Sequence, residues 1–475
     1  MAVVFVGVLV LVIAVLAAVH WYLWRRLVRD VAARGTWYRR VGTSLLVLLP
    51  LTAVAAQSAG RADVPFLLKQ ILAWPGFLWL AMVLYLTLAL LAGEAVRPLL
   101  RRFLERRDAR RAASPASGNG AEETGEGTGR GAATAPRPAA SAAASAEEGA
   151  GGGAPAGKAR TAVADRDGAD PGPGTGGTGT ATGTATGTAT GAGPGERPPA
   201  GPSRRLFVAR TVAAAAGVAA AGTVGYGTYG VMRGPKLKRV TVPLAKLPRA
   251  AHGYRIAVVS DIHLGPVLGR SHTQRIVDTI NRADADMVAV VGDLVDGTVA
   301  ELGSAAEPLA RLRSRDGSYF VTGNHEYFGD AGEWIDHVRE LGLQPLENAR
   351  RELRHFDLAG VNDLAGEEEG QGPDFARALG DRDTSRAVVL MAHQPVMIHD
   401  AVDHGVDLQL SGHTHGGQMW PATYIAQAAN PTLAGLERYG DTQLYVSRGA
   451  GAWGPPVRVG AESDITVVEL ASGQA

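Results

Sequence analysis

Residues 256–263 read IAVVSDIH, a short run of small and β-branched residues that ends in a serine, an aspartate and a histidine. A run of this kind, closed by a polar turn, is typical of a β-strand. Polar residues that come directly after a strand lie on the loop at its carboxyl end, where layered α/β folds carry their functional groups. The segment therefore predicts a strand with Asp261 and His263 at its end.

The same pattern recurs along the C-terminal half of the chain. Four further β-rich runs lie at 287–291, 319–322, 387–391 and 408–410. Helical candidates lie between the runs, such as 271–282 and 331–341. Strands that alternate with helices predict a layered α/β domain over 240–475.

Each of the five predicted strands is followed by residues that can bind a metal. In chain order these turns read SDIH at 260–263, GD at 292–293, GNHE at 323–326, AHQP at 392–395 and GHTHGG at 412–417. Taken singly they are weak signals, because buried histidines are more often satisfied by hydrogen bonds and Gly-Asp is often only a turn or a helix cap. Together they place five of the 12 histidines, two aspartates and one asparagine at strand ends. We expect them to converge on one side of a sheet.

This set of ligands predicts a pair of divalent cations. Imidazole and carboxylate groups suit manganese, iron, zinc or nickel, and the chain has no cysteine to supply a thiolate. A carboxylate shared by two ions holds them about 3.5–4 Å apart, and the ions lower the pKa of a trapped water to about 7. They also offset the charge that develops on a phosphoryl group. At an extended strand end, Asp261 and His263 would point to the same side, as would His413 and His415.

The ordered set DxH, GD, GNHE, a single His before Gln-Pro, and GHTH resembles the calcineurin-like metallophosphoesterase family over about 254–470. The tail YVSRGAGAWGPP at 445–456 is similar to the membrane-associated branch of that family, in which some members have several N-terminal spans or a twin-arginine leader. The resemblance implies an α/β fold in which two β-sheets are sandwiched between helices. It also implies a metal-dependent phosphohydrolase that uses in-line attack by a metal-bridging hydroxide.

The resemblance assigns a role to eight residues of this chain. The first metal would be bound by Asp261, His263 and His415, the second by Asn324, His393 and His413, and Asp293 would bridge them. His325 would not be a ligand but would protonate the leaving oxygen or stabilise the transition state. Outside the resemblance, Arg448 lies between a strand and a glycine-rich turn and is a candidate contact for a substrate phosphate, with a structural salt bridge as the alternative.

Residues 1–111 predict a membrane region. Three stretches carry no charge, at 1–24, 41–60 and 71–93, and about 20 apolar residues suffice to span a bilayer as a helix. Buried helices of a soluble protein are the alternative, which three such runs in close succession disfavour. Arginines gather at 25–40 and 97–111, so the positive-inside rule places these segments in the cytoplasm and the N-terminus outside.

Residues 112–203 contain no Leu, Ile, Met, Phe, Tyr or Trp, and they predict a disordered linker rich in Ala, Gly, Pro and Thr. The segment 204–235 follows, with SRRLF at 203–207 and an uncharged run at 211–232. It predicts a fourth transmembrane helix or a twin-arginine-like segment, with a soluble Ala/Gly helix as the alternative. If three spans end in the cytoplasm, a fourth delivers 240–475 to the extracytoplasmic side.

These features favour a membrane-anchored, multi-pass phosphoesterase of the cell membrane. Its substrate would be a phosphomonoester, a phosphodiester or a lipid- or envelope-linked phosphoester. The alternative is a membrane transporter or sensor with an appended phosphoesterase-like domain. Apart from His20, however, the uncharged runs hold no ionisable residue of the kind that transport pathways use. A binding module without turnover is a third possibility, which the complete ligand set disfavours.

The formal net charge of +1 is a cancellation between two unlike halves. Residues 1–240 carry 28 basic and 14 acidic groups, whereas 241–475 carry 19 basic and 32 acidic groups. The basic half suits an anionic membrane surface, and the acidic half would repel a polyanion. We therefore expect a phosphoester and membrane lipids as partners, and no nucleic acid. The sequence indicates no particular protein partner.

Overall fold

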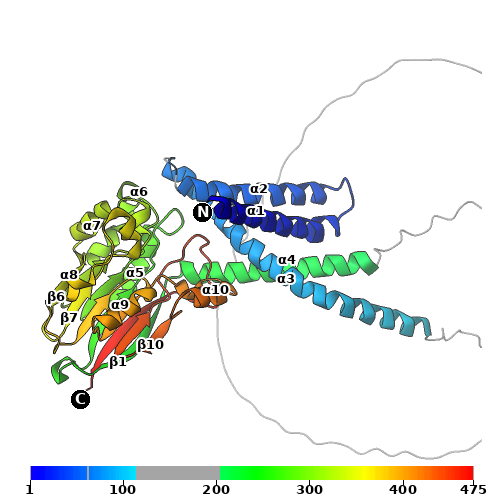
Figure 1. The fold of residues 1–475 in the computed structure, drawn as a ribbon. Coiled ribbons are helices and arrows are strands. Elements are labelled where there is room, and N and C mark those ends of the chain that lie inside the picture. The colour runs from blue at the N-terminus through cyan, green and yellow to red at the C-terminus, as the bar shows by residue number, and fades with distance from the viewer. Residues whose placement is uncertain (1, 61, 63, 114–203, 474–475) are drawn as a thin grey trace, which may run out of the picture. The chain divides into compact units, whose positions relative to one another are not determined.

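A computed structural model describes residues 2–60, 62, 64–113 and 204–473 (Figure 1). The described residues up to Ala109 and from Arg204 onward belong to one compact unit. The predicted linker at 112–203 lies outside the described residues, apart from its first two positions, which end a helix.

Among the described residues, four helices are long and apolar enough to cross a membrane, and each overlaps one of the four uncharged runs. They are α1 (Ala2–Trp24), which a π-helical turn at Arg25–Arg29 continues, α2 (Trp37–Gly60), α3 (Phe66–Ala113) and α4 (Arg204–Met232). At 48 residues, α3 is longer than the bilayer requires, because it continues from the apolar run into the basic segment that follows.

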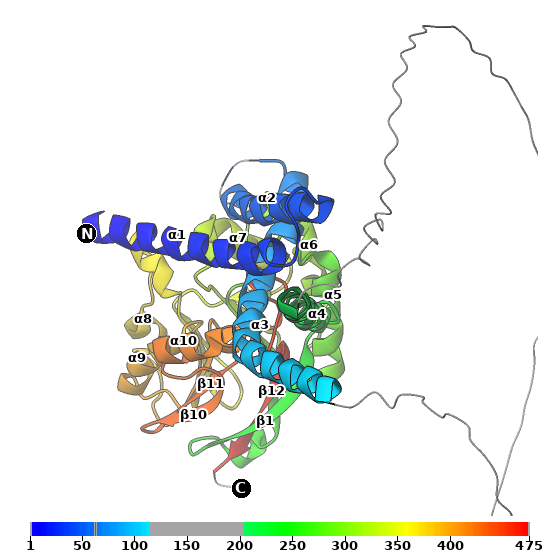
Figure 2. The ribbon, with the colours of Figure 1, turned by 90° about the vertical axis from the view of Figure 1, so that its right-hand side faces the viewer.

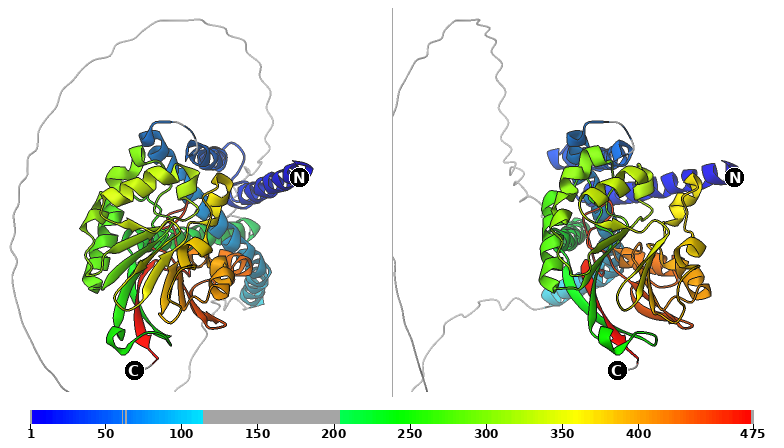
Figure 3. Two further views of the ribbon diagram at one scale, coloured as in Figure 1. Left: turned by 60° about the vertical axis from the view of Figure 1, so that its left-hand side comes forward. Right: turned by 90° about the vertical axis from the view of Figure 1, so that its left-hand side faces the viewer.

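The C-terminal part folds into two six-stranded sheets that pack face to face between helices (Figure 3). The first sheet contains, in spatial order, β1 (Lys236–Leu244), β12 (Asp464–Ser472), β2 (Tyr254–Val259), β3 (Met287–Val291), β4 (Ser318–Val321) and β5 (Gln344–Pro345). The second contains β10 (Gly435–Tyr439), β11 (Thr442–Val446), β9 (Leu408–Ser411), β8 (Val388–Met391), β7 (Asp357–Gly360) and β6 (Ala349–Glu352). The expected two-sheet α/β sandwich is confirmed.

The inner strands of each sheet run parallel. In the first sheet β2, β3, β4 and β5 are parallel, while β1 and β12 lie side by side and run opposite to β2 (Figure 2). In the second sheet β7, β8, β9 and β11 are parallel, and the edge strands β6 and β10 are antiparallel to their neighbours. Parallel strands end at the same edge, so the loops after β2, β3 and β4 gather at one edge, as do those after β8 and β9.

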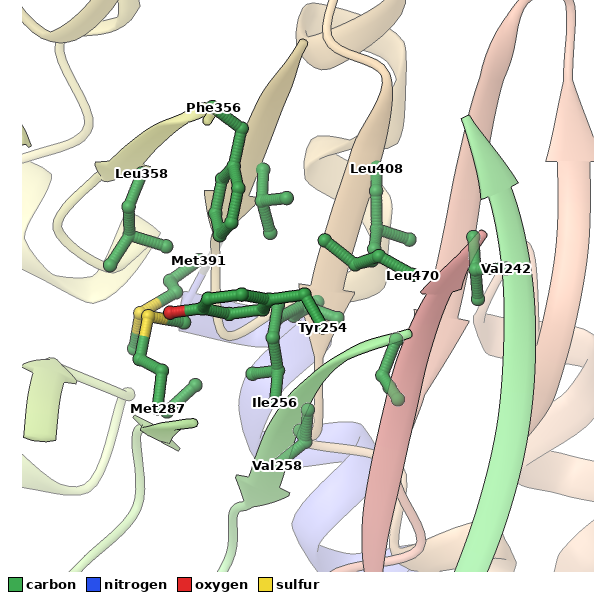
Figure 4. Close-up of a cluster of buried hydrophobic side chains, with 14 of the residues drawn as sticks. Val242, Tyr254, Ile256, Val258, Met287, Phe356, Leu358, Met391, Leu408 and Leu470 are labelled. Atoms are coloured by element: carbon green, nitrogen blue, oxygen red, sulfur yellow. The ribbon is translucent and has the colours of Figure 1, made fainter. Parts of the chain in front are cut away.

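Side chains of β2 alternate between two cores, as the period of a strand requires. Ile256 and Val258 lie between the sheets, with Met287 from the neighbouring strand β3 and Leu358 from β7 of the other sheet (Figure 4). Ala257 and the residues on its side of the sheet pack against α5 (Arg270–Ala283), α6 (Val299–Ala306) and α7 (Ala331–Glu340). On the second sheet, α8 (Phe375–Leu379) and α9 (Ile398–Asp403) cover the outer face. The last helix, α10 (Ala422–Ala429), has no buried residue.

The predicted strands are all present, with bounds shifted by up to two residues. The first begins at Tyr254 rather than at Ile256. The ring of Tyr254 packs edge-on against Phe356 in the core between the sheets, with ring centroids 5.0 Å apart. A tyrosine beside an arginine gives no local sign of burial, because its partner lies on a distant strand.

One buried histidine outside the predicted site has a bearing on stability. His272 on α5 is 1% exposed, and neither ring nitrogen has a hydrogen-bond partner among the described residues. Burial, together with the charges of Arg275 and Arg458, lowers its pKa to about 3. The unfolded chain, with a pKa of about 6.5, binds a proton that the folded chain does not. Between these values the free energy of unfolding therefore falls as the pH falls, by about 1.4 kcal/mol per pH unit.

We expect His272→Leu to remove this contribution to acid sensitivity. The measurement is the denaturant midpoint of the full chain in detergent from about pH 6.5 down to pH 4, compared with wild type. His399 on α9 is exposed, so His399→Leu serves as the matched control and should retain the wild-type pH dependence. An unchanged pH dependence in His272→Leu would contradict the prediction.

Candidate metal centre

All eight residues predicted for the metal site lie in the five loops that follow β2, β3, β4, β8 and β9. Asp261 and His263 follow β2, Asp293 follows β3, Asn324 and His325 follow β4, His393 follows β8, and His413 and His415 follow β9. The expectation that they converge on one side of a single sheet is wrong. The first three loops belong to one sheet and the last two to the other. The site therefore lies where the carboxyl edges of two sheets meet.

In the part of the chain that the structure describes, three overlapping clusters of side chains could hold a metal ion. They comprise Asp261, His263, Asp293 and His415; Asp293, His393 and His413; and His263, Asp296 and His325, and the ligand atoms of each cluster lie within 4.8 Å of one another. Asp293 is common to the first two clusters. Its Oδ2 atom lies 3.7 Å from His263 Nε2 and 3.1 Å from His393 Nε2. Asn324 joins the second cluster, with its Oδ1 atom 2.9 Å from His413 Nδ1.

The ligand loops depart from the extended backbone that the sequence suggested. Eight non-glycine residues in the described part of the chain have a positive φ, and five of them are predicted ligands: Asp261, His263, Asp293, His413 and His415, with φ between 49° and 71°. The idea that Asp261 and His263 alternate along an extended strand end is therefore wrong. Left-handed backbone costs non-glycine residues of order 1–3 kcal/mol each and persists only where the surroundings enforce it.

Backbone hydrogen bonds between the loops supply that enforcement. Asp261 N donates to the carbonyl of Gly292 at 3.1 Å, and His263 N donates to the carbonyl of Asp293 at 3.1 Å. The two sheets are joined as well, because His413 N donates to Asp261 Oδ1 at 2.9 Å. Each strained residue is thus held by a loop from another strand.

Hydrogen bonds at Nδ1 determine where the imidazole lone pairs point. His393 Nδ1 lies 2.8 Å from the carbonyl oxygen of Val291, which can only accept, so Nδ1 carries the proton and Nε2 presents a lone pair. His263 Nδ1 is likewise 2.8 Å from Asp296 Oδ1. His393 Nε2 is buried and has no hydrogen-bond partner among the described residues. A buried lone pair beside a carboxylate, without a donor of its own, fits a divalent cation.

The electrostatics of the centre favour ionised Asp293 and Asp296, whereas burial raises the pKa of Asp261. Burial by itself would raise the pKa of Asp293, but the charges of His393, His263 and His325 hold it well below its usual range. Burial also opposes ionisation of Asp296, yet contacts with His263 and His325 lower its pKa to about 2. Deprotonated carboxylates at neutral pH are the form that binds metals.

Two carboxylates that support the site were missed by the sequence reasoning. Asp296 Oδ1 accepts from both His263 Nδ1, at 2.8 Å, and His325 Nδ1, at 2.7 Å. Glu326 accepts from three backbone N–H groups in the loops after β3 and β4, at 2.6–3.1 Å. Burial, with the nearby charge of Asp293, raises the pKa of Glu326 to about 8. The signal was present, since Glu326 ends the GNHE motif and Asp296 stands three residues after Asp293.

Two arginines differ in their relation to the site. Arg458, also missed, is 4% exposed and donates to the carbonyl oxygens of His415, at 3.0 Å, and Gly451, at 2.6 Å. It stands in the glycine- and proline-rich tail, where no metal-ligand motif marks it. Arg448, which the sequence suggested as a phosphate contact, lines a separate groove with Lys238 and Asp464, and its aliphatic stem lies beside Gly416.

Gly412 has no side chain at a point where Asp261 packs against its backbone. A Cβ atom at this position would overlap Asp261 Oδ2 and Ser260 Oγ. We therefore expect Gly412→Ala to displace Asp261 and to weaken metal binding about 10- to 100-fold, measured by titration of the metal-depleted full chain. Gly269 has nothing within 4 Å of an added Cβ, so Gly269→Ala is the control and should bind metal as wild type does. Equal affinities for both variants would show that the close approach is unimportant.

Comparisons with known proteins agree with this architecture. The profile described as calcineurin-like phosphoesterase matches residues 254–417. A zebrafish (Danio rerio) protein named "Transmembrane protein with metallophosphoesterase domain" is 40% identical over 259 residues, which cover 52% of this chain and 59% of that protein. The cattle (Bos taurus) protein of the same name is 38% identical over 253 residues, which cover 50% of this chain and 57% of that protein. This chain therefore spans somewhat more than half the length of both vertebrate relatives.

A bacterial relative is matched over nearly its whole length. An uncharacterized metallophosphoesterase of Aquifex aeolicus is 32% identical over 240 residues, which cover 50% of this chain and 91% of that protein. Among solved structures, an archaeal phosphodiesterase aligns with a TM-score of 0.24 at 12% identity and covers 40% of this chain and 82% of its own. With the profile match and the near-complete bacterial alignment, the chain belongs to the calcineurin-like phosphoesterase family.

Proposed function

We propose that this protein is a membrane-anchored, dinuclear metal-dependent phosphoesterase. The observation that carries the proposal is the position of Asp293, whose carboxylate belongs to two metal-competent clusters at once. One carboxylate shared by two sets of histidines is the arrangement that holds a pair of cations. Two divalent ions, of manganese, iron, zinc or nickel, would supply Lewis acidity and an activated water there.

The eight residues would divide the work as follows. The first ion would be held by Asp261, His263 and His415, and the second by Asn324, His393 and His413, with Asp293 between them. The close approach of His263 Nε2 and His415 Nε2, at 3.0 Å, supports the first set. The 2.9 Å contact between Asn324 and His413 supports the second.

His325 would act as the general acid. Asp296 accepts from its Nδ1, which leaves Nε2 directed toward the cluster, 4.0 Å from Asp293 Oδ2. In hydrolysis the oxygen of water forms a new bond to phosphorus and the bond to the leaving oxygen breaks. Burial opposes the charged ring, but the hydrogen bond to Asp296 and the charge of Asp293 raise the pKa of His325. The protonated ring would give that oxygen its proton from Nε2, a contribution typically worth 10²–10⁴-fold.

The test is hydrolysis of a chromogenic phosphodiester and a chromogenic phosphomonoester by the full chain in detergent, with each of the four metals supplied in turn. We expect turnover with at least one metal. For a phenyl phosphodiester, whose leaving oxygen needs a proton, His325→Ala should lose about 100-fold or more. His399→Ala should retain wild-type turnover, because His399 is exposed on α9. Failure of wild type to hydrolyse either substrate with any of the metals would contradict the proposal. Arg448→Ala tests the sequence-based phosphate contact, and an unchanged KM would exclude it.

We also propose that the chain is multi-pass and that the phosphoesterase domain is extracytoplasmic. The segment 25–40, assigned to the cytoplasm by its arginines, contacts residues at the same end of the other helices. Arg26 pairs at 3.0 Å with Glu94, just before the segment 97–111, and Arg210, near the start of α4, donates to the carbonyl of Val31 at 3.1 Å. On the opposite side, Lys69 pairs with Glu301 of the domain at 2.7 Å. The contacts at one end of the helices join the segments expected in the cytoplasm, and the contact at the other end involves the phosphoesterase domain. Both support this orientation.

A topology reporter fused after residue 475 and a second one inserted in the predicted linker at 112–203 test the orientation. We expect the first to report an extracytoplasmic position and the second a cytoplasmic one. Both reporters on the same side would refute the arrangement of four spans. Membrane anchoring suggests a lipid- or envelope-linked phosphoester, and the shape of the site bears on that choice.

A further inference from the structure

Two large aromatic rings stand exposed at the rim of the metal centre. Phe328, in the turn after β4, is 69% exposed, and its ring centroid lies 4.6 Å from that of His325. Trp453, in the glycine-rich tail, is 52% exposed, with its centroid 5.6 Å from the same histidine. A phosphoryl group needs cations and hydrogen-bond donors, so these rings have no part in binding it. Exposed apolar surface at the mouth of a site instead indicates an apolar ligand.

A groove leads from the metal centre to the apolar helices. At one end its lining is His263 and Asp296, and Trp453 forms part of its wall. At the other end it is lined by Phe66, Ala73 and Phe77 of α3. Both α2 and α3 are long and apolar enough to cross a membrane. The lining therefore changes from residues of the metal-competent clusters at the metal centre to mainly apolar side chains of α3, with the Lys69–Glu301 ion pair also in its wall.

We infer that the substrate is an amphiphile taken from the bilayer, whose phosphoester lies at the metal centre and whose hydrocarbon chain lies along this groove. The hydrocarbon would cover Trp453 and Phe328 and continue toward α3, where the bilayer supplies the same apolar surroundings. This inference rests on the proposed function and names its substrate class. In the proposed topology the α2–α3 connection faces outward, so the amphiphile comes from the outer leaflet.

The test compares two phosphodiesters with the same reacting group. Methyl p-nitrophenyl phosphate and hexyl p-nitrophenyl phosphate release the same phenolate, and they differ only in five methylene groups. We expect the full chain in detergent, loaded with the active metal, to show a kcat/KM about tenfold or more higher for the hexyl ester. Burial of about two of the five methylene groups suffices for that preference.

Variants at the rim of the metal centre show where the hydrocarbon chain of the substrate lies. We expect the hexyl-to-methyl ratio of kcat/KM to fall about threefold or more in Trp453→Ala and in Phe328→Ala, two variants in different loops. Trp453→Phe should preserve the ratio, because it keeps a large apolar ring. Val402 of α9 is the matched control, since it is an exposed apolar residue beside Gly440, in the turn that precedes β11. That turn lies at the sheet edge opposite the metal centre, so Val402→Ala should change neither rate.

The outcomes separate this inference from the proposed function. Hydrolysis of the methyl ester with no preference for the hexyl ester overturns the inference and leaves the phosphoesterase intact. A preference for the hexyl ester that survives both alanine substitutions also overturns the inference, because the hydrocarbon chain would then lie elsewhere. If wild type hydrolyses neither ester, the proposed function fails and the inference fails with it.

Discussion

Asp293→Asn is expected to lower turnover of a chromogenic phosphodiester about 1,000-fold or more and to leave fewer than two metal ions bound per chain. The carboxylate of Asp293 belongs to both metal-competent clusters, so one substitution weakens both ion positions at once. Asparagine is the informative replacement, because it tolerates the left-handed backbone of this position, where φ is 52°. Steady-state kinetics and metal analysis of the same preparation measure the two effects together.

The chain offers a matched control in Asp284, an aspartate with a φ of 50° at the end of α5. Its side chain is 90% exposed and makes only a surface ion pair with Arg255. Asp284→Asn removes a carboxylate from the same backbone conformation, and activity and metal content should stay at wild-type values. Two bound ions and full turnover in Asp293→Asn would refute the role of Asp293 as the shared ligand.

The second large effect is expected at Asp296. Its Oδ1 atom accepts from His263 and from His325, so Asp296 is a positioning residue that acts through both rings. We expect Asp296→Asn to lower kcat about 100-fold for a phenyl ester, whose leaving oxygen needs a proton. The p-nitrophenyl ester, whose phenolate leaves without one, should lose about tenfold or less. The difference isolates the contribution made through His325.

Two comparisons decide whether Asp296 acts in this way. A merely structural role would lower turnover of both esters by the same factor, and that result would contradict the prediction. If Asp296→Asn lowered turnover only by displacing His263, the variant would bind less metal, and the ratio of kcat between the two esters would stay unchanged. Asp296→Glu keeps the carboxylate on a side chain that is longer by one methylene group. We therefore expect it to retain part of the turnover of the phenyl ester that Asp296→Asn loses.

Where the information is local, the sequence indicated the residues that gather at the candidate site. Each predicted ligand stands within five residues of the end of an apolar run, so strand and ligand are read together, as in the segment from Ile256 to His263. Arg458 has no such mark, and Asp296, although it stands near a strand end, belongs to no motif. An aspartate in a turn is ordinary, and its importance appears only when His263 and His325, from two strands, both reach one of its oxygens. Arg458 is recognised only because the tail folds back beneath His415.

By itself, the sequence determined which residues are candidate metal ligands, their order along the chain and the existence of apolar helices, because these follow from residue type and short-range periodicity. Only the tertiary structure decided which ligands meet. His263 and His415 are separated by 152 positions, yet their Nε2 atoms lie 3.0 Å apart. That distance depends on the packing of two sheets through a common core, and on loops that hold the ligands in left-handed conformations that no local preference favours.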